Sequence, residues 1–431
     1  MDPLGLVRAP LDLPEMYEVR QEFEAPTVGD MAAEVGCQLE RAGTAGRLRP
    51  GMRIAVTAGS RGIRNIVTIL RTVVDWLKSH GADPFVIGAM GSHGGGTAVG
   101  QKDLLASLGV TEDSMGCPVL TGDRVSLVGV TARGHKVYCD SLAYESDGII
   151  LVNRVKPHTS FRGPIESGVT KMMAVGLGKA PGATYVHMLG PKGMTEAIPS
   201  MGEVFIASGK VLAAIAVLEN AFDETAELVG LAPADILARE PTLLKRAKEM
   251  MPSLPADAVD VLVVGEMGKN YSGTGMDTNI LGRYRLESLP DPEAPRVERV
   301  VVLDLSEESH GNATGVGLAD VVTTRLAGKI DRKPTYLNVL TSTFLGRGAV
   351  PPAMDNDWAA IGLAVMSLGR ATTEGLKLMM IKNTLNLGAV YISASLLDDL
   401  GKRPWARVVG GPVRVEFDRD FSLSGPPVRS H

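Results

Sequence analysis

Three histidines and a lysine in the first half of the chain have the types and positions of residues that do chemistry. His93 lies in a glycine-rich run directly after an apolar segment typical of a strand, and His158 follows another such segment. An apolar, glycine-interrupted segment then carries Lys171, and His187 comes sixteen residues later. Imidazole suits proton transfer near neutral pH and is also a common metal ligand. These residues therefore indicate acid/base or metal chemistry.

The elements that position these residues follow a βαβ pattern. Residues 53–57, 84–88 and 148–152 are short apolar runs typical of buried strands. Apolar spacing predicts a helix over residues 65–80, and residues 203–214 also have a helical pattern. Each strand runs into a polar or glycine-rich loop. Because ligands bind outside the carboxyl ends of strands in open α/β sheets, we expect the three loops to lie together at one edge.

The whole chain of 431 residues has an ordinary globular composition, with 45% hydrophobic and 22% charged residues. Its formal net charge of −5 offers no broad basic surface, so nucleic acid is not an expected partner. No apolar run is long enough to span a membrane, and the N-terminus lacks the order of a signal peptide, so we expect a cytoplasmic protein. Cys37, Cys117 and Cys139 form no CxxC pair, which favours reduced thiols.

Two prolines within residues 252–255 mark the expected linker between two domains. The predicted fold class is α/β, with two domains that each contain a mostly parallel sheet flanked by helices, and an active site in the interdomain cleft. Residues 1–254 are expected to form the N-terminal catalytic and cofactor-binding domain, and residues 255–404 the C-terminal domain. Residues 405–431 are expected to form closing strands that pack back on the first domain.

The strand-end histidine, the glycine-bracketed lysine and the later histidine together resemble the core motif of the nickel-pincer lactate racemase family. The resemblance implies that Lys171 carries, through a thioamide, a nicotinic acid-derived mononucleotide that grips nickel by two sulfurs and one carbon. It implies that His187 is the fourth nickel ligand and that His93 and His158 are the acid/base pair. Lys171 lies thirteen positions after His158, a spacing a few residues longer than in the family's best-known members.

The resemblance also implies contacts to substrate and cofactor. Arg61, in the loop after the first strand, matches the arginine that binds the substrate carboxylate, and Arg64 would add a second cationic contact. The family places an aspartate three residues before that arginine, where this chain has Ala58. The remaining positions implied as cofactor-binding are Ser60, Gly168, the Asp-x-Asn pair Asp277 and Asn279, and Arg285 in place of a lysine.

We therefore expect an isomerase, a racemase of 2-hydroxy acids, that moves hydride to the cofactor while a histidine removes the hydroxyl proton. Two enantiomers present their hydroxyls to opposite sides, which calls for one histidine on each side. Several arginines slightly favour malate or another larger hydroxy acid over lactate: Arg61, Arg64, Arg154 and Arg162. The expected partners are this small molecule and the cofactor-synthesis enzymes, with a homo-oligomer as the default assembly.

Two alternatives stay open at the level of sequence. A conventional metal- or NAD-dependent enzyme would use His93, His158 and His187 as ligands to zinc or iron and would need no lysine adduct. However, the loop around His93 does not match the GxGxxG dinucleotide motif. A non-catalytic homologue that binds a small ligand would keep the fold and lose the cofactor, an alternative to which Ala58 lends weight.

Overall fold

The computed structural model describes residues 12–60, 63–286, 289–370 and 372–425. The chain divides into two compact units. The N-terminal unit is Glu24–Met251. The C-terminal unit begins at Pro252 and also includes the segment that ends at Phe23. Each unit contains a mixed sheet with a parallel core and flanking helices, so the predicted α/β class is confirmed. The N-terminal segment, expected in the first domain, instead belongs to the C-terminal unit.

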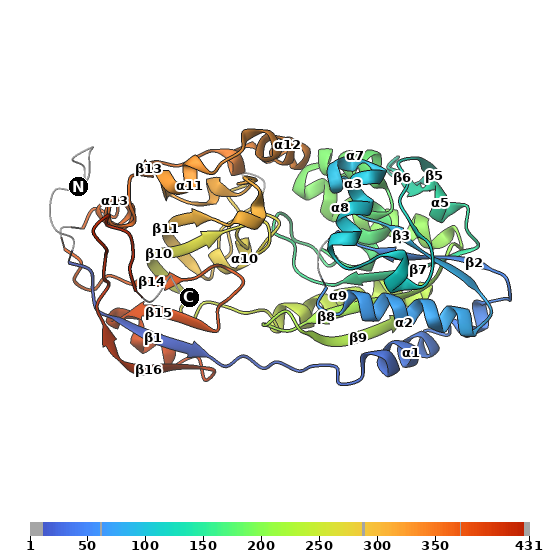
Figure 1. Cartoon of the computed structure of the whole chain (residues 1–431), viewed down its shortest axis with the longest axis horizontal. Helices are drawn as coiled ribbons and strands as arrows, with labels where there is room; N and C mark the ends of the chain where they lie inside the picture. The colour runs from blue at the N-terminus through green and yellow to red at the C-terminus, as the bar shows by residue number, and fades with distance from the viewer. Residues whose placement is uncertain (1–11, 61–62, 287–288, 371, 426–431) are drawn as a thin grey trace. The chain divides into compact units, whose positions relative to one another are not determined.

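In the described part of the N-terminal unit, six strands form one sheet in the order β4-β3-β2-β7-β8-β9 (Figure 1). Only β9 runs antiparallel to its neighbour. The chain passes from β2 to β3 on one side of β2 and later returns to β7 on its other side. The strand order thus reverses between β2 and β7, which is where α/β sheets form ligand sites. The bounds are β2 Arg53–Ala58, β3 Asp83–Gly88, β4 Val119–Leu120, β7 Gly148–Arg154, β8 Val211–Glu219 and β9 Thr225–Leu231.

Helices α1 (Met31–Arg41) and α2 (Ile66–Ser79) pack on this sheet through one continuous apolar core. The inward side chains of α2, which include Ile69, Leu70 and Val73, are fully buried, and this confirms the helix predicted from their spacing. The other elements of the unit are α3 Ala98–Ser107, α4 Glu112–Met115, β5 Val125–Val130, β6 Lys136–Asp140, α5 Ser141–Tyr144, α6 Val169–Lys171, α7 Lys179–Met188, α8 Gly190–Ala207 and α9 Ile236–Glu249.

The helix predicted over residues 203–214 is wrong in its second half. Helix α8 ends at Ala207, and β8 begins at Val211 as a central strand of the sheet. All nine residues of β8 are buried. A strand buried on both faces has a continuous apolar sequence without an alternating pattern, so periodicity does not distinguish it from a buried helix.

In the described part of the C-terminal unit, eight strands follow the order β13-β12-β11-β10-β14-β15-β1-β16. Strand β16 pairs with β1, the N-terminal strand, whereas residues 405–431 were expected to pack on the first domain. The strands are β1 Met16–Gln21, β10 Ala258–Met267, β11 Arg296–Leu305, β12 Val321–Thr323, β13 Ala353–Met354, β14 Leu378–Ile381, β15 Ala389–Ser393 and β16 Ala406–Val413. The helices are α10 Thr278–Leu281, α11 Thr324–Gly328, α12 Arg332–Ser342, α13 Asp357–Met366 and α14 Leu397–Leu400.

No helix in the described residues is both long and apolar enough to cross a membrane. Cys117 and Cys139 are buried and Cys37 is exposed, and all three are free thiols.

Candidate active site

The loops after β2 and β3 meet at the carboxyl edge of the N-terminal sheet. Ser60, just after β2, places its Oγ 3.0 Å from Nδ1 of His93, which follows β3. The amide of Gly91 donates to the carbonyl of Gly176 at 3.0 Å, which ties the β3 loop to the segment that follows Lys171. The structure therefore brings together three segments that are far apart in the sequence.

Lys171 and His158 both lie against the ring of Phe161. The Nζ atom of Lys171 lies 5.5 Å from the centre of the Phe161 ring. The imidazole of His158 packs on the same ring with 4.4 Å between ring centres. Lys171 ends α6, and a π-helical turn, Met172–Gly176, follows it directly. Such turns are rare and occur frequently at functional sites.

His187, on α7, is an imidazole kept neutral by its surroundings. Burial and then the positive charge of nearby Lys171 lower the pKa of His187 to about 4. Its Nδ1 is buried and has no hydrogen-bond partner among the residues that the structure describes. A buried ring nitrogen without a partner costs free energy unless a ligand satisfies it, and neutral imidazole is the form that binds metals. Lys171 and His187 therefore fit a lysine-linked group that carries a metal.

His158 is held by a buried carboxylate that the sequence did not single out. Glu166, only 1% exposed, accepts from the amide of His158 at 2.7 Å. The same carboxylate pairs with Arg162 at 3.1 Å and with Lys248 at 2.8 Å. The only sequence signal for this contact was the unusual polar cluster between His158 and Lys171.

A second unpredicted network supports the His93 loop. Lys179, 2% exposed, pairs with fully buried Asp140 at 3.2 Å and donates to the carbonyl of Gly88 at 2.9 Å. It also donates to Oε1 of Gln101, whose Nε2 donates to the carbonyls of Gly91 at 2.9 Å and His93 at 3.3 Å. Because Lys179 opens α7, the network joins the His93 loop to the helix that carries His187.

The four arginines counted as substrate contacts have different surroundings. Arg154 pairs with Glu219 and, at 3.0 Å, with Asp223, while Arg162 pairs with Glu166. Arg64 is exposed, and its backbone amide donates to Glu219 at 2.7 Å. Arg61 lies outside the described residues. Two of the four arginines are therefore already paired with carboxylates of the protein, so they give no support to a dicarboxylate substrate.

Gly168, expected to bind cofactor, has a local reason to be glycine. A Cβ at this position would lie 1.8 Å from Oε1 of Glu240. Glu240, 1% exposed, receives the amide of Thr170 on Oε2 at 3.0 Å, and so fixes the turn that precedes Lys171. Burial raises the pKa of Glu240 to about 7, although its hydrogen bonds from Thr170 lower it.

The raised pKa of Glu240 predicts that stability falls as the pH rises. The folded state binds the carboxyl proton of Glu240 more tightly than the unfolded state does. The stability gained in this way is complete below the ordinary glutamate pKa and is lost as the pH rises through about 7. We expect Glu240→Gln, which stays neutral and keeps an acceptor for Thr170, to remove roughly 3 kcal/mol of pH dependence between pH 5 and 9. Urea unfolding across this range tests it, with the exposed Glu203→Gln as the matched control. Parallel wild-type and Glu240→Gln profiles would contradict the assignment.

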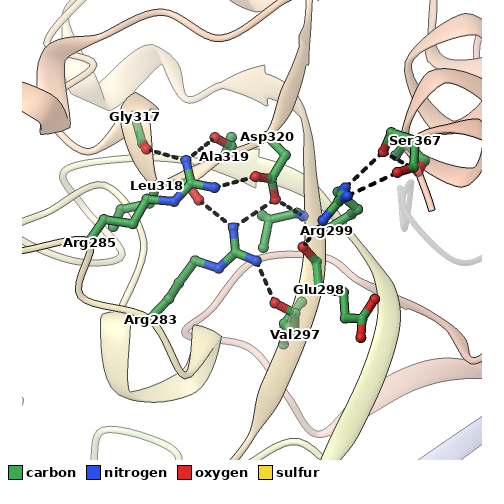
Figure 2. Close-up of polar contacts among 12 residues, drawn as sticks. Arg283, Arg285, Val297, Glu298, Arg299, Gly317, Leu318, Ala319, Asp320 and Ser367 are labelled. Atoms are coloured by element: carbon green, nitrogen blue, oxygen red, sulfur yellow. Dashed lines mark hydrogen bonds and ion pairs between the residues drawn. The ribbon is translucent and has the colours of Figure 1, made fainter. Parts of the chain in front are cut away.

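The remaining expected cofactor residues lie in the C-terminal unit and contact other residues of that unit. Asp277 caps α10 and accepts from both the amide and the side chain of Asn279, at 2.8 and 2.7 Å. Arg285 donates to the carbonyls of Gly317 and Ala319 at 2.9 and 2.8 Å and pairs with Asp320. Figure 2 shows the guanidinium groups of Arg283 and Arg285 both directed at that carboxylate.

Within the described part of the chain, no three His, Cys, Asp or Glu side chains are grouped so that they could hold a metal ion. His93, His158 and His187 therefore do not form a site made of protein ligands alone in this structure.

Comparison with known proteins gives little further information. No protein-family model and no curated protein sequence matches the chain. Among solved structures, the chain is similar to the lactate racemase apoprotein from Thermoanaerobacterium thermosaccharolyticum, with 13% identity and a TM-score of 0.43. The match covers 68% of this chain and 85% of the other.

Proposed function

We propose that this chain is a racemase or epimerase of 2-hydroxy acids that carries a nickel-pincer nucleotide on Lys171. The observation that supports it most is that His187, whose pKa the charge of Lys171 helps to lower, is a neutral imidazole with a buried Nδ1 that lacks a partner among the described residues. His158 shares the Phe161 ring with Lys171, and His93 lies in a loop hydrogen-bonded to the segment after Lys171. The N-terminal unit thus contains a lysine for cofactor attachment, a histidine for the metal and two histidines for acid/base chemistry.

Each residue has a separate part in this chemistry. The bound cofactor supplies an acceptor for the α-hydrogen of the substrate as hydride, because that hydrogen is too weakly acidic for a side-chain base to remove as a proton. Lys171 provides the amine for the covalent link, and His187 provides a neutral nitrogen for the metal. A histidine takes the hydroxyl proton, as general base catalysis requires. Ser60 and Glu166 orient His93 and the His158 loop through the hydrogen bonds described above.

The substrate class follows from this chemistry. It needs a hydroxyl and a hydrogen on the carbon next to a carboxylate, and Arg61 with Arg64 is the proposed cationic pair for that carboxylate. The proposed substrates therefore include both lactate and malate.

The test is turnover of single enantiomers. Protein co-expressed with a pincer-cofactor synthesis pathway is incubated separately with the L and D forms of lactate, malate and larger 2-hydroxy acids, and the products are separated by chiral chromatography. We expect at least one acid to convert in both directions. If a known lactate racemase loaded in the same cells is active and this chain converts none, the proposal is wrong.

A further inference from the structure

A cavity in the C-terminal unit is lined mainly by arginines. Its volume is about 410 Å³, and Asp291 is the single acidic residue in its described lining, which also contains Arg283, Arg285 and Arg296. Arg296 is the first residue of β11, and Asp320, which pairs with both Arg283 and Arg285, directly precedes β12. The cavity therefore lies at the amino ends of parallel strands. Ligands of α/β sheets usually bind at the carboxyl ends, so this is a separate place in the unit.

The chain after α10, which contributes to this cavity, has an unusual backbone. Gly282 has a φ of +65°, and a Cβ there would lie 1.6 Å from the carbonyl oxygen of Pro295. Arg285 has a φ of +47°, in the left-handed region that residues other than glycine rarely adopt. Asp291 stabilises this conformation, because its Oδ1 accepts from the amides of Tyr284 at 2.5 Å and Arg285 at 3.3 Å. Strained residues of this kind are concentrated at ligand sites.

Arg283 and Arg285 keep hydrogen-bond donors for a ligand. Arg283 donates to Asp320 and to two backbone carbonyls. Arg285 likewise donates to Asp320 and to two other backbone carbonyls (Figure 2). A guanidinium has five N–H groups, and these contacts use three of them in each side chain. Two N–H groups of each arginine are therefore without an acceptor among the residues that the structure describes.

Arg296 is the least constrained of the three arginines. Its Nη2 lies 3.6 Å from Oε1 of Glu298, and both side chains are exposed, by 75% and 43%. An exposed pair at this distance contributes little free energy, so Arg296 is available to a ligand in the cavity. The three arginines of the cavity outnumber the carboxylates of Asp291 and Asp320. Arginine suits carboxylate and phosphate groups, with which it forms two parallel hydrogen bonds.

We propose that this cavity binds a small organic anion through a carboxylate or phosphate group. Its volume is in the range of sites for small organic molecules, and the excess of arginines favours an anion. Arg296 and the remaining N–H groups of Arg283 and Arg285 bind the anionic group, and the charge of Asp291 opposes it. The inference does not rest on the proposed function. It gives Arg285 a ligand other than the cofactor expected from the sequence.

Binding is measured by isothermal titration calorimetry on the full-length protein at constant ionic strength, because salt screens exposed charges. Glycerol 3-phosphate is the probe for a phosphate group and succinate the probe for a carboxylate, and neither is a 2-hydroxy acid. We expect at least one of them to bind with a Kd below about 1 mM, and the tighter one identifies the anionic group. A Kd above about 1 mM for both would overturn the proposal.

A matched pair of variants tests whether the anion occupies the cavity. We expect Arg296→Gln, at an exposed side chain, to weaken binding by at least about 10-fold. Arg299→Gln makes the same change of charge on the same strand and is the control. The Arg299 guanidinium donates to Oγ and the carbonyl of Ser367 at 2.8 and 3.0 Å, as Figure 2 shows, and should not affect binding. Equal weakening by both variants would contradict a site in the cavity.

Asp291→Asn should change the affinity in the opposite direction. Asparagine keeps an oxygen acceptor for the amides of Tyr284 and Arg285 but removes the negative charge of the lining. We expect the anion to bind about 3- to 10-fold more tightly, because a like charge near it is lost. Unchanged or weaker binding in this variant would also contradict the proposed site.

Discussion

Replacement of Lys171 by arginine will abolish the interconversion of hydroxy-acid enantiomers, with a loss of at least about 10⁴-fold. Arginine keeps the positive charge and the length of the side chain, and it still suits the face of Phe161. A guanidinium stays protonated in proteins and has no free amine for a thioamide link. The variant therefore removes cofactor attachment with little change in packing or charge.

The loss is measured by chiral chromatography on protein from cofactor-producing cells. Lys192→Arg, at an exposed position of α8, is the matched control and should keep wild-type activity. Activity of Lys171→Arg within about 10-fold of the wild type would show that no covalent link at this lysine is needed.

Replacement of Lys179 by methionine will lower the free energy of unfolding by about 3–5 kcal/mol, because it leaves the carboxylate of Asp140 buried without its cation. Burial lowers the pKa of Lys179, and the charge of Asp140 offsets this lowering only in part. Each of the two buried charges therefore depends on the other for compensation. The variant also removes the donor to Gln101, and we expect faster amide hydrogen exchange in the loop that contains His93.

A double variant separates the charge from the packing. Asp140→Asn keeps an acceptor for the amide of Leu142, which the carboxylate now caps at 2.8 Å, but carries no charge. Lys179→Met with Asp140→Asn should therefore recover a large part of the lost stability in urea unfolding. A double variant as unstable as the sum of the two single variants would contradict a coupled ion pair.

The parts of the fold predicted from sequence were those with local signals. Strands β2, β3 and β7 are apolar runs that end in polar or glycine-rich loops, and α2 has a regular helical pattern. The pairing of β1 with β16 joins residues from opposite ends of the chain, and no local pattern indicates such a contact.

Within the candidate site, sequence position singled out the histidines and Lys171 as candidates but not the residues that contact them. Glu166, Lys179 and Glu240 belong to residue types that are seldom fully buried, and apart from the polar cluster that contains Glu166 nothing in the sequence marked them. Conversely, arginines that looked suited to bind ligands have protein partners. Arg285, for example, meets Asp320 from a distant part of the sequence, which only the folded chain reveals.

The measurement that tests the central proposal most directly is the intact mass of the wild-type chain together with its nickel content, after co-expression with a pincer-cofactor synthesis pathway. We predict an adduct of mononucleotide size that maps to Lys171 on peptide analysis, with nickel equimolar to the chain. His187→Ala should keep the adduct and lose most of the nickel. An unmodified mass without nickel, from cells that load a known lactate racemase in parallel, would contradict the proposal.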